Sequence, residues 1–226
     1  MQESTLNGQL STSNSPLQRF QLNVERRRLA EGGLSVKRWV LKKIAIYGGT
    51  FDPVHHAHLI LARDALETLG LDEVIFVPAA VSPLKKAAPV ASGELRLAML
   101  RAAIKGEPKF AADDCELRRP SPSYTIDTVE ELRRRNNDAA IYCLIGEDNV
   151  DRLSKWHRFA ELKGMVHFVV LDRRGQPASH SYRVIDRKID ISATEIRTRV
   201  ASGRSIRYFV PSTVEEIIRR EKLYQE

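Results

Sequence analysis

The sequence has few cysteines and no long apolar run. Its 226 residues include only Cys115 and Cys143, which are too few for a disulfide framework. No apolar stretch approaches the roughly 18 residues of a membrane-spanning helix. The N-terminus lacks the charged start, apolar stretch and small-residue cleavage site of a secretory signal. We therefore expect a cytoplasmic protein without a membrane partner.

Positive charge is in excess, but most of the excess lies in one segment. The net charge is +7, and residues 1–43 contain eight Lys or Arg against three acidic residues. The rest of the chain is nearly neutral, so a nucleic-acid partner is not expected. We predict a basic, disordered extension at residues 1–38 and one folded domain at 39–226. The extension could tether the protein weakly to an anionic surface or be dispensable.

Short apolar runs alternate with amphipathic segments in the folded part. The runs predict strands at 40–47, 73–77, 110–112, 140–145 and 166–171, and an extended stretch at 183–189. The amphipathic segments predict helices at 55–69, 93–104, 125–135, 148–163 (with a break near residue 154), 193–202 and 212–222. Continuously apolar strands are typical of strands buried on both faces. The expected fold is α/β, with a single doubly wound, mostly parallel sheet and ligands at the carboxyl ends of its strands.

The first polar cluster follows the first predicted strand. Residues 48–50 (Gly-Gly-Thr) lead through a turn to a helix that begins with three histidines in four positions. Glycines let a ligand approach the backbone, and the unpaired amides of a helix N-terminus suit a phosphate group. His55 and His58 are expected to share one helix face, while His56 points elsewhere. Two imidazole donors there can stabilise negative charge on a phosphate during transfer.

Plainer interpretations of this cluster remain open. Adjacent glycines often form an ordinary turn, and a histidine pair could bind zinc, although no nearby cysteine or carboxylate completes a tetrahedral set. The segment also differs from the G-x-x-x-x-G-K-[ST] and G-x-G-x-x-G phosphate-binding loops.

The second cluster, residues 191–197 (Ile-Ser-Ala-Thr-Glu-Ile-Arg), opens a predicted helix. Ser192 is a favourable N-cap, and Glu195 is expected to complete a capping box, which is a sufficient structural explanation. A functional explanation adds the amides near Ala193 and Thr194, together with Arg197 one turn later, as partners for phosphate oxygens.

Together the two clusters resemble the signature of the nucleotidyltransferase superfamily. Residues 48–58 are similar to its T/H-x-G-H motif, with Ala57 where the family has Gly, and residues 191–197 resemble its I-S-x-T-x-I-R motif. The match is close to the bacterial nicotinate mononucleotide adenylyltransferases and covers about residues 42–225. It implies a Rossmann-like nucleotidyltransferase fold. The extra methyl of Ala57 could narrow the phosphate path.

The resemblance assigns roles to particular residues. The expected catalytic residues are His55, His58, Arg197 and Lys85. The expected ATP- and phosphate-binding residues lie at strand ends or at the helix start: Gly48, Gly49, Thr50, Ser192, Ala193, Thr194, Gly146 and Asp148. Lys85 lies in a loop similar to the family's P-x-x-x-P-P-H-[KR] segment, in which Leu84 replaces the His and Ser82 replaces a Pro.

Other segments resemble the parts of the family that select the mononucleotide. Residues 122–128 match P-S-Y-T-x-x-T, whose backbone amides bind the nicotinate carboxylate in the family, although Ser123 or Thr125 could also simply cap a helix. Trp156 matches the tryptophan that stacks on the pyridine ring. A lone tryptophan is more often a core residue. The expected nicotinate-binding residues are Ser123, Tyr124, Thr125 and Trp156.

The resemblance implies adenylyl transfer from ATP to nicotinate mononucleotide, which gives nicotinate adenine dinucleotide and pyrophosphate in NAD biosynthesis. Mg²⁺ is the expected cofactor, held mainly by substrate phosphates and water, with no protein metal ligands. ATP and nicotinate mononucleotide are the expected partners, and homo-oligomerisation stays open. The alternatives are an enzyme with another acceptor, such as nicotinamide mononucleotide, and a non-catalytic nucleotide sensor or nucleic-acid binder that uses the basic extension.

Overall fold

The structure is a computed structural model that describes residues 41–80, 88–175 and 180–225. The predicted extension at 1–38, the domain boundary at 39 and the candidate residue Lys85 lie outside these ranges. Within them, no helix has both the length and the apolar character needed to span a membrane.

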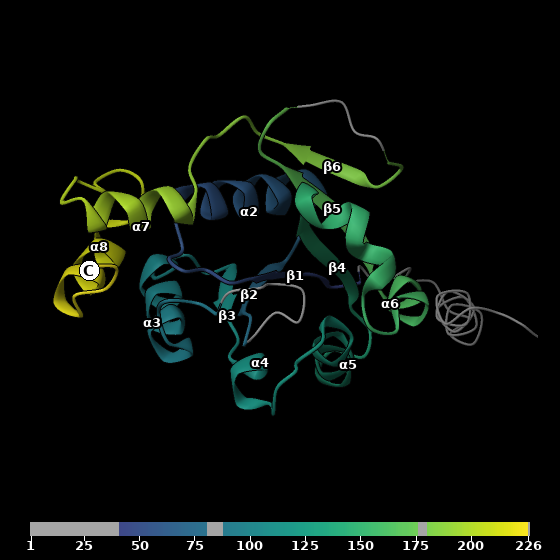
Figure 1. The fold of residues 1–226 in the computed structure, drawn as a ribbon. Coiled ribbons are helices and arrows are strands. Elements are labelled where there is room, and N and C mark those ends of the chain that lie inside the picture. Colours follow the sequence, from purple (N-terminus) through teal and green to yellow (C-terminus); the bar gives the residue numbers. More distant parts are fainter. Residues whose placement is uncertain (1–40, 81–87, 176–179, 226) are drawn as a thin grey trace, which may run out of the picture. The chain divides into compact units, whose positions relative to one another are not determined.

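Six strands in the described residues form one sheet in the order β3-β2-β1-β4-β5-β6 (Figure 1). Their bounds are β1 (Lys43–Gly49), β2 (Glu73–Pro78), β3 (Phe110–Ala112), β4 (Ala140–Gly146), β5 (His167–Asp172) and β6 (Arg183–Asp186). Every neighbouring pair is parallel, which confirms the predicted sheet. The first strand was predicted to end at residue 47. It continues to 49 because Gly48 and Gly49 still pair with β2.

Helices cover both faces of this sheet (Figure 1). Their bounds are α2 (His56–Leu69), α3 (Gly93–Ala103), α4 (Cys115–Arg118), α5 (Thr125–Arg135), α6 (Phe159–Met165), α7 (Ala193–Ala201) and α8 (Ser212–Arg220). Most match their predictions within a residue or two. The short helix α4 was not predicted.

The predicted helical segment at 148–163, with its break near residue 154, is confirmed except for the form of its first part and the exact position of the break. The chain makes a 3₁₀-helix, η1 (Glu147–Lys155), and then the separate helix α6. Trp156 has extended backbone, and Arg158 lies in the left-handed region with φ 51°, so helical hydrogen bonding cannot run through them. The break therefore lies just after Trp156 rather than near residue 154.

The strands are continuously apolar because each face of the sheet has its own core. In β1, Ala45 and Tyr47 pack in one core cluster, while Ile44 and Ile46 pack in the other. Successive side chains of a strand point to opposite faces, so a strand covered on both sides needs apolar residues at every position.

The strand order reverses between β1 and β4, since the chain continues from β1 to one side of the sheet and returns to the other. At such a switch point the loops after the two strands diverge, and a crevice opens at their carboxyl ends. The Gly48–Thr50 segment at the end of β1 and the Gly146–Asp148 segment at the end of β4 both lie there. The topology thus brings together two polar segments about 100 residues apart in the sequence.

Candidate active site

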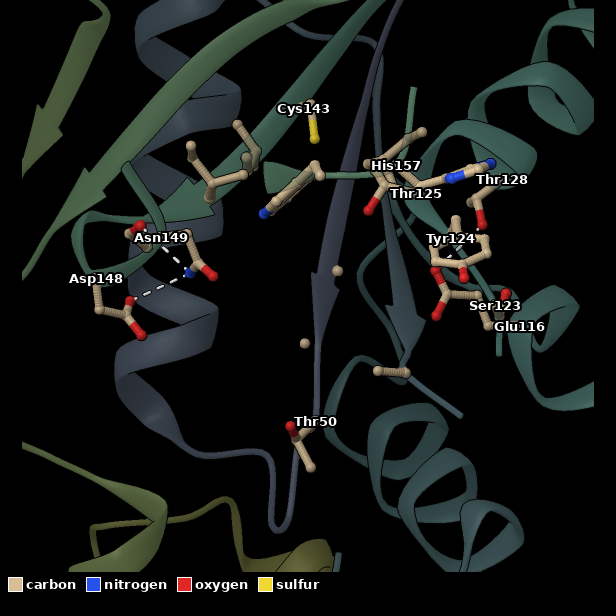
Figure 2. Close-up of a pocket in the computed structure, with 18 of the residues that line it drawn as sticks. Thr50, Glu116, Ser123, Tyr124, Thr125, Thr128, Cys143, Asp148, Asn149 and His157 are labelled. Carbon is tan, nitrogen blue, oxygen red and sulfur yellow. Dashed lines mark hydrogen bonds between the residues drawn. The ribbon is translucent and has the colours of Figure 1, made fainter. Parts of the chain in front are cut away.

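A cavity of about 300 Å³ opens at this switch point (Figure 2). Figure 2 shows Asp148 and Asn149 on one side of it, the residues at the start of α5 on the opposite side, and Thr50 between them at the end of β1. Nine predicted site residues line it: Gly48, Gly49, Thr50, Ser123, Tyr124, Thr125, Gly146, Asp148 and Trp156. The glycine turn and the Gly146–Asp148 segment, predicted to bind ATP and its phosphates, thus share one cavity with the segments predicted to bind the pyridine ring.

Sequence reasoning missed several lining residues. Glu116, Asn149, Lys155 and His157 also border the cavity. Glu116 could have been expected, because it follows the carboxyl end of β3, where ligand-binding residues gather in this class of sheet. Burial raises the pKa of its carboxyl to about 6, while hydrogen bonds and the nearby Arg119 act in the opposite direction.

Two glycines at the cavity lie in close contact with a neighbouring side chain. A Cβ atom on Gly49 would lie 2.8 Å from the ring of Phe51, and one on Gly146 would lie 2.5 Å from a carboxylate oxygen of Asp148. Neither distance is compatible with a side chain unless the neighbour moves. The glycines therefore keep the strand ends open to a ligand and preserve the local turns.

His55 and His58 form a stacked pair at the start of α2. Their ring centroids lie 3.7 Å apart with an interplanar angle of 22°, so the predicted sharing of one face is confirmed. His55 is the N-cap of α2 rather than its first residue, and its backbone N–H donates to His58 Nδ1 at 3.3 Å. This bond assigns the proton of a neutral His58 ring to Nε2. Neither histidine is among the residues that line the cavity.

His55 is almost completely buried, with 1% of its surface exposed. Desolvation, together with smaller contributions from the positive charges of Arg173 and His56, lowers the pKa of its imidazole to about 3. Its ring is therefore neutral at physiological pH. Nδ1 of His55 has no hydrogen-bond partner among the described residues.

The predicted phosphate-binding motif at α7 reaches the first motif through Arg197. Its Nη1 donates to the backbone oxygen of Asp52 at 2.7 Å, and its Nη2 donates to Thr194 Oγ1 at 3.2 Å. Ser192 caps α7 by accepting from the Glu195 backbone N–H at 3.1 Å, as predicted. The Glu195 carboxylate accepts instead from Arg199 Nε, so the expected reciprocal half of the capping box is replaced by an ion pair.

Asp52 is a buried junction that sequence reasoning missed. Its carboxylate accepts from the backbone N–H groups of Val90 and Ala91 and from the hydroxyl of Tyr224, the last at 2.7 Å. Arg96, which is 2% exposed, donates to the backbone oxygen of Thr50 at 2.8 Å. The turn between β1 and α2 is thus held from α3, from α7 and from near the C-terminus.

Arg173 is a further cation that sequence reasoning missed. It follows the carboxyl end of β5, and its Nη1 donates at 3.1 Å to the backbone oxygen of Ile191, directly before the Ser192 cap. Ala57 is fully buried and is absent from the lining of the cavity. Its methyl group therefore does not border this cavity, and its predicted effect on the phosphate path stays a prediction.

At the α5 end, Tyr124 stacks on His157 with ring centroids 4.3 Å apart (Figure 2). The backbone N–H of Tyr124 donates to Asp127 Oδ2 at 3.3 Å, as part of the helix cap. Asp127 therefore competes with a ligand carboxylate for the Tyr124 amide, which was expected to donate to the ligand. Trp156 lines the cavity and meets Phe168 edge-on at 6.3 Å.

The two cysteines are both buried and unpaired with each other. Burial raises the pKa of the Cys115 thiol to about 11 and that of Cys143 to about 12, so both are protonated at neutral pH. Across residues 41–80, 88–175 and 180–225, no group of three or more His, Cys, Asp or Glu side chains is arranged to hold a metal ion.

Comparison with known proteins agrees with this geometry. Residues 46–199 match the cytidylyltransferase-like family model. A probable nicotinate-nucleotide adenylyltransferase from Shouchella clausii is 43% identical over 189 residues, covering 81% of this chain and 97% of that protein. Another from Gemmatimonas aurantiaca is 43% identical over 197 residues, covering 81% and 93%.

Solved structures share the fold. The nicotinic acid mononucleotide adenylyltransferase of Plasmodium falciparum, complexed with NaAD, superposes with a TM-score of 0.66 at 21% identity, covering 81% of this chain and 97% of that one. A putative nicotinate-nucleotide adenylyltransferase from Vibrio parahaemolyticus gives a TM-score of 0.60 at 24% identity, covering 82% and 97%. The chain therefore belongs to the cytidylyltransferase-like family and, within it, to the nicotinate-nucleotide adenylyltransferases.

Proposed function

We propose that this protein transfers the adenylyl group of ATP to nicotinate mononucleotide, giving nicotinate adenine dinucleotide and pyrophosphate. The observation that carries the proposal is the shared cavity at the switch point, which joins glycine-rich strand ends to an aromatic end at Tyr124 and Trp156. A dinucleotide product needs a site with one part for each nucleotide. The curated relatives named above support the choice of substrate.

In the proposed reaction, a phosphate oxygen of the mononucleotide forms a bond to the α-phosphorus of ATP. The bond from that phosphorus to the bridging oxygen of the β-phosphate breaks, and the electron pair leaves with pyrophosphate. Such a transfer requires no covalent bond to the protein. Positioning and stabilisation of charge lower the barrier.

His58 and Arg197 are the proposed donors to the phosphates. Nδ1 of His58 accepts from the His55 amide, so Nε2 is the nitrogen that offers a proton. Arg197 uses two of its five N–H donors on Asp52 and Thr194, and these bonds fix the plane of the guanidinium. The capped N-terminus of α7 adds backbone amides that suit the β- and γ-phosphates.

His55 has a supporting role in this mechanism. Its ring is buried, stacks on His58 and stays neutral, so it orients His58 without adding a positive charge of its own. Mg²⁺ would enter with ATP, bound by phosphate oxygens and water, and would supply charge neutralisation for the leaving pyrophosphate.

A coupled assay with the two pyridine mononucleotides tests the proposal. ATP is supplied with either nicotinate or nicotinamide mononucleotide, and pyrophosphate release is followed. We expect kcat/KM to favour the acid at least about ten-fold, the lower end of what a hydrogen bond to a charged group contributes. Equal use of both would overturn the substrate assignment and leave adenylyl transfer standing. If neither mononucleotide led to release of pyrophosphate, the proposed adenylyl transfer would be overturned.

A further inference from the structure

Arg119 lies behind the α5 end of the cavity and is not one of the residues that line it. Its side chain is 21% exposed. The guanidinium donates to Ser123 Oγ at 3.1 Å, to Thr128 Oγ1 at 2.9 Å and to Glu131 Oε2 at 2.8 Å. Both hydroxyl residues do line the cavity, and both are nearly buried, Ser123 at 8% exposure and Thr128 at 3%.

These bonds decide where the hydroxyl protons go. A hydroxyl has one proton to donate and two lone pairs. Thr128 accepts from Arg119 and donates to Glu116 Oε1 at 3.1 Å, so its proton is used within the protein. Ser123 also accepts from Arg119, but its hydroxyl has no acceptor of its own in the part of the chain that the structure describes. Its proton therefore remains for a ligand in the cavity.

The charges around the α5 end of the cavity also point to Arg119. Glu116 lines the cavity, and Glu131 pairs with Arg119 on its other side. Two carboxylates near the pyridine end would repel a substrate that carries a third. The Arg119 guanidinium lies between them, as it bonds Glu131 directly and reaches Glu116 through Thr128. Opposite charge at this range favours an ionised ligand, and it acts more strongly where water is excluded.

We propose that Arg119 is a positioning residue that makes the cavity selective for a mononucleotide whose pyridine ring carries a carboxylate. Arg119 holds the Ser123 hydroxyl so that the hydroxyl proton faces the ligand, and it offsets the negative charge of Glu116. This inference rests on the proposed function and adds to it the residue that discriminates the acid from the amide. A carboxamide is uncharged, so it gains far less from the positive charge of Arg119.

The test compares Arg119→Met with Arg118→Met. Arg118 is the matched control: it is the adjacent arginine, 62% exposed, and it pairs with Asp114 outside the cavity wall. Both variants remove one positive charge at nearly the same place in the chain. Each is assayed for kcat/KM with nicotinate and with nicotinamide mononucleotide at one neutral pH. Calorimetric binding of each mononucleotide alone provides a second readout that is independent of turnover.

We expect Arg119→Met to lower kcat/KM for the acid by about ten- to a hundred-fold, the value of a hydrogen bond to a charged group, and that for the amide by less than about three-fold. Arg118→Met should leave the ratio unchanged. Ser123→Ala should shift the ratio in the same direction as Arg119→Met. The double variant should lose little more than Arg119→Met alone, because Ser123 contributes only through the hydroxyl that Arg119 holds.

Equal losses for both mononucleotides in Arg119→Met would overturn the inference, as would a matching change of ratio in Arg118→Met. If Arg119→Met did not fold by circular dichroism, Arg119→Lys would replace it. Lysine keeps the charge but loses the planar fork, so an intermediate ratio is expected, and an unchanged ratio would count against the inference. If wild-type protein turned over neither mononucleotide, the proposed function would fail, and the calorimetric ratio would still decide the role of Arg119.

Discussion

The buried histidine at the start of α2 makes the stability of the fold depend on pH in a calculable way. His55 is 1% exposed, and desolvation lowers the pKa of its imidazole from 6.5 to about 3. Between these values the unfolded chain binds a proton that the folded chain does not. The free energy of unfolding must then rise with pH across this window, and acidification must remove stability. Replacement by asparagine, which is favourable at an N-cap position, removes the titrating group.

The magnitude follows from the width of the window that is crossed. Acidification from about pH 8 to about pH 5 ends roughly 1.5 pH units below the unfolded-state pKa of His55. Each of those units lowers the free energy of unfolding by about 1.36 kcal/mol. Wild-type protein should therefore lose about 2 kcal/mol relative to His55→Asn. Glu116, whose raised pKa works with the opposite sign, is present in both proteins and cancels in the difference.

Urea unfolding of both proteins at several pH values measures this difference directly. The expected result is a gap in unfolding free energy that changes by about 2 kcal/mol between pH 8 and pH 5, with equal m-values. Parallel stability curves would refute the reasoning, because they would mean that the His55 ring takes up a proton in the folded state as readily as in the unfolded one.

Three further predictions concern single side chains. His58→Ala should lower kcat by about 10²–10³ in a folded protein, the usual cost of one transition-state donor, whereas His56→Ala should change kcat little. Steady-state kinetics of both variants would show equal losses if the assignment were wrong. Trp156→Ala should weaken the acid and amide mononucleotides by a similar factor in the same assay, since stacking does not sense the ring substituent, and loss of the acid alone would contradict this. Tyr224→Phe removes the 2.7 Å hydrogen bond to Asp52 and should lower the free energy of unfolding in urea by about 1.5–3 kcal/mol. Tyr208→Phe, at a residue that is 76% exposed, serves as the control. Equal stabilities of the two variants would show that the bond contributes nothing.

Much of the fold could be predicted because its signals are local. The apolar runs of β4 and β5 have the length and continuity of strands covered on both sides, and the intervening segments carry helical periodicity. At residues 148–163 the break was predicted near residue 154, and it lies at 156–158. The amphipathic pattern did not show that the part before the break is a 3₁₀-helix or that Arg158 takes a left-handed conformation.

The candidate site could be predicted in its parts but not in its assembly. The glycine turn, the Ser-Tyr-Thr segment and Trp156 are recognisable from neighbouring residues, and all of them line the same cavity. Glu116 and Arg119 escaped notice because their importance lies in hydrogen bonds to Thr128 and Ser123 rather than in any pattern of their own.

The sequence by itself determined the alternation of strands and helices, the phosphate-suited turns and the residue types of the site, since each depends on a few consecutive residues. Only the tertiary structure decided that His55 is buried and neutral, and that Arg197 reaches Asp52 across 145 positions and Tyr224 reaches it across 172. The physical reason is that burial, and with it the pKa of an imidazole or the direction of a hydroxyl proton, depends on segments that meet only after the sheet has formed.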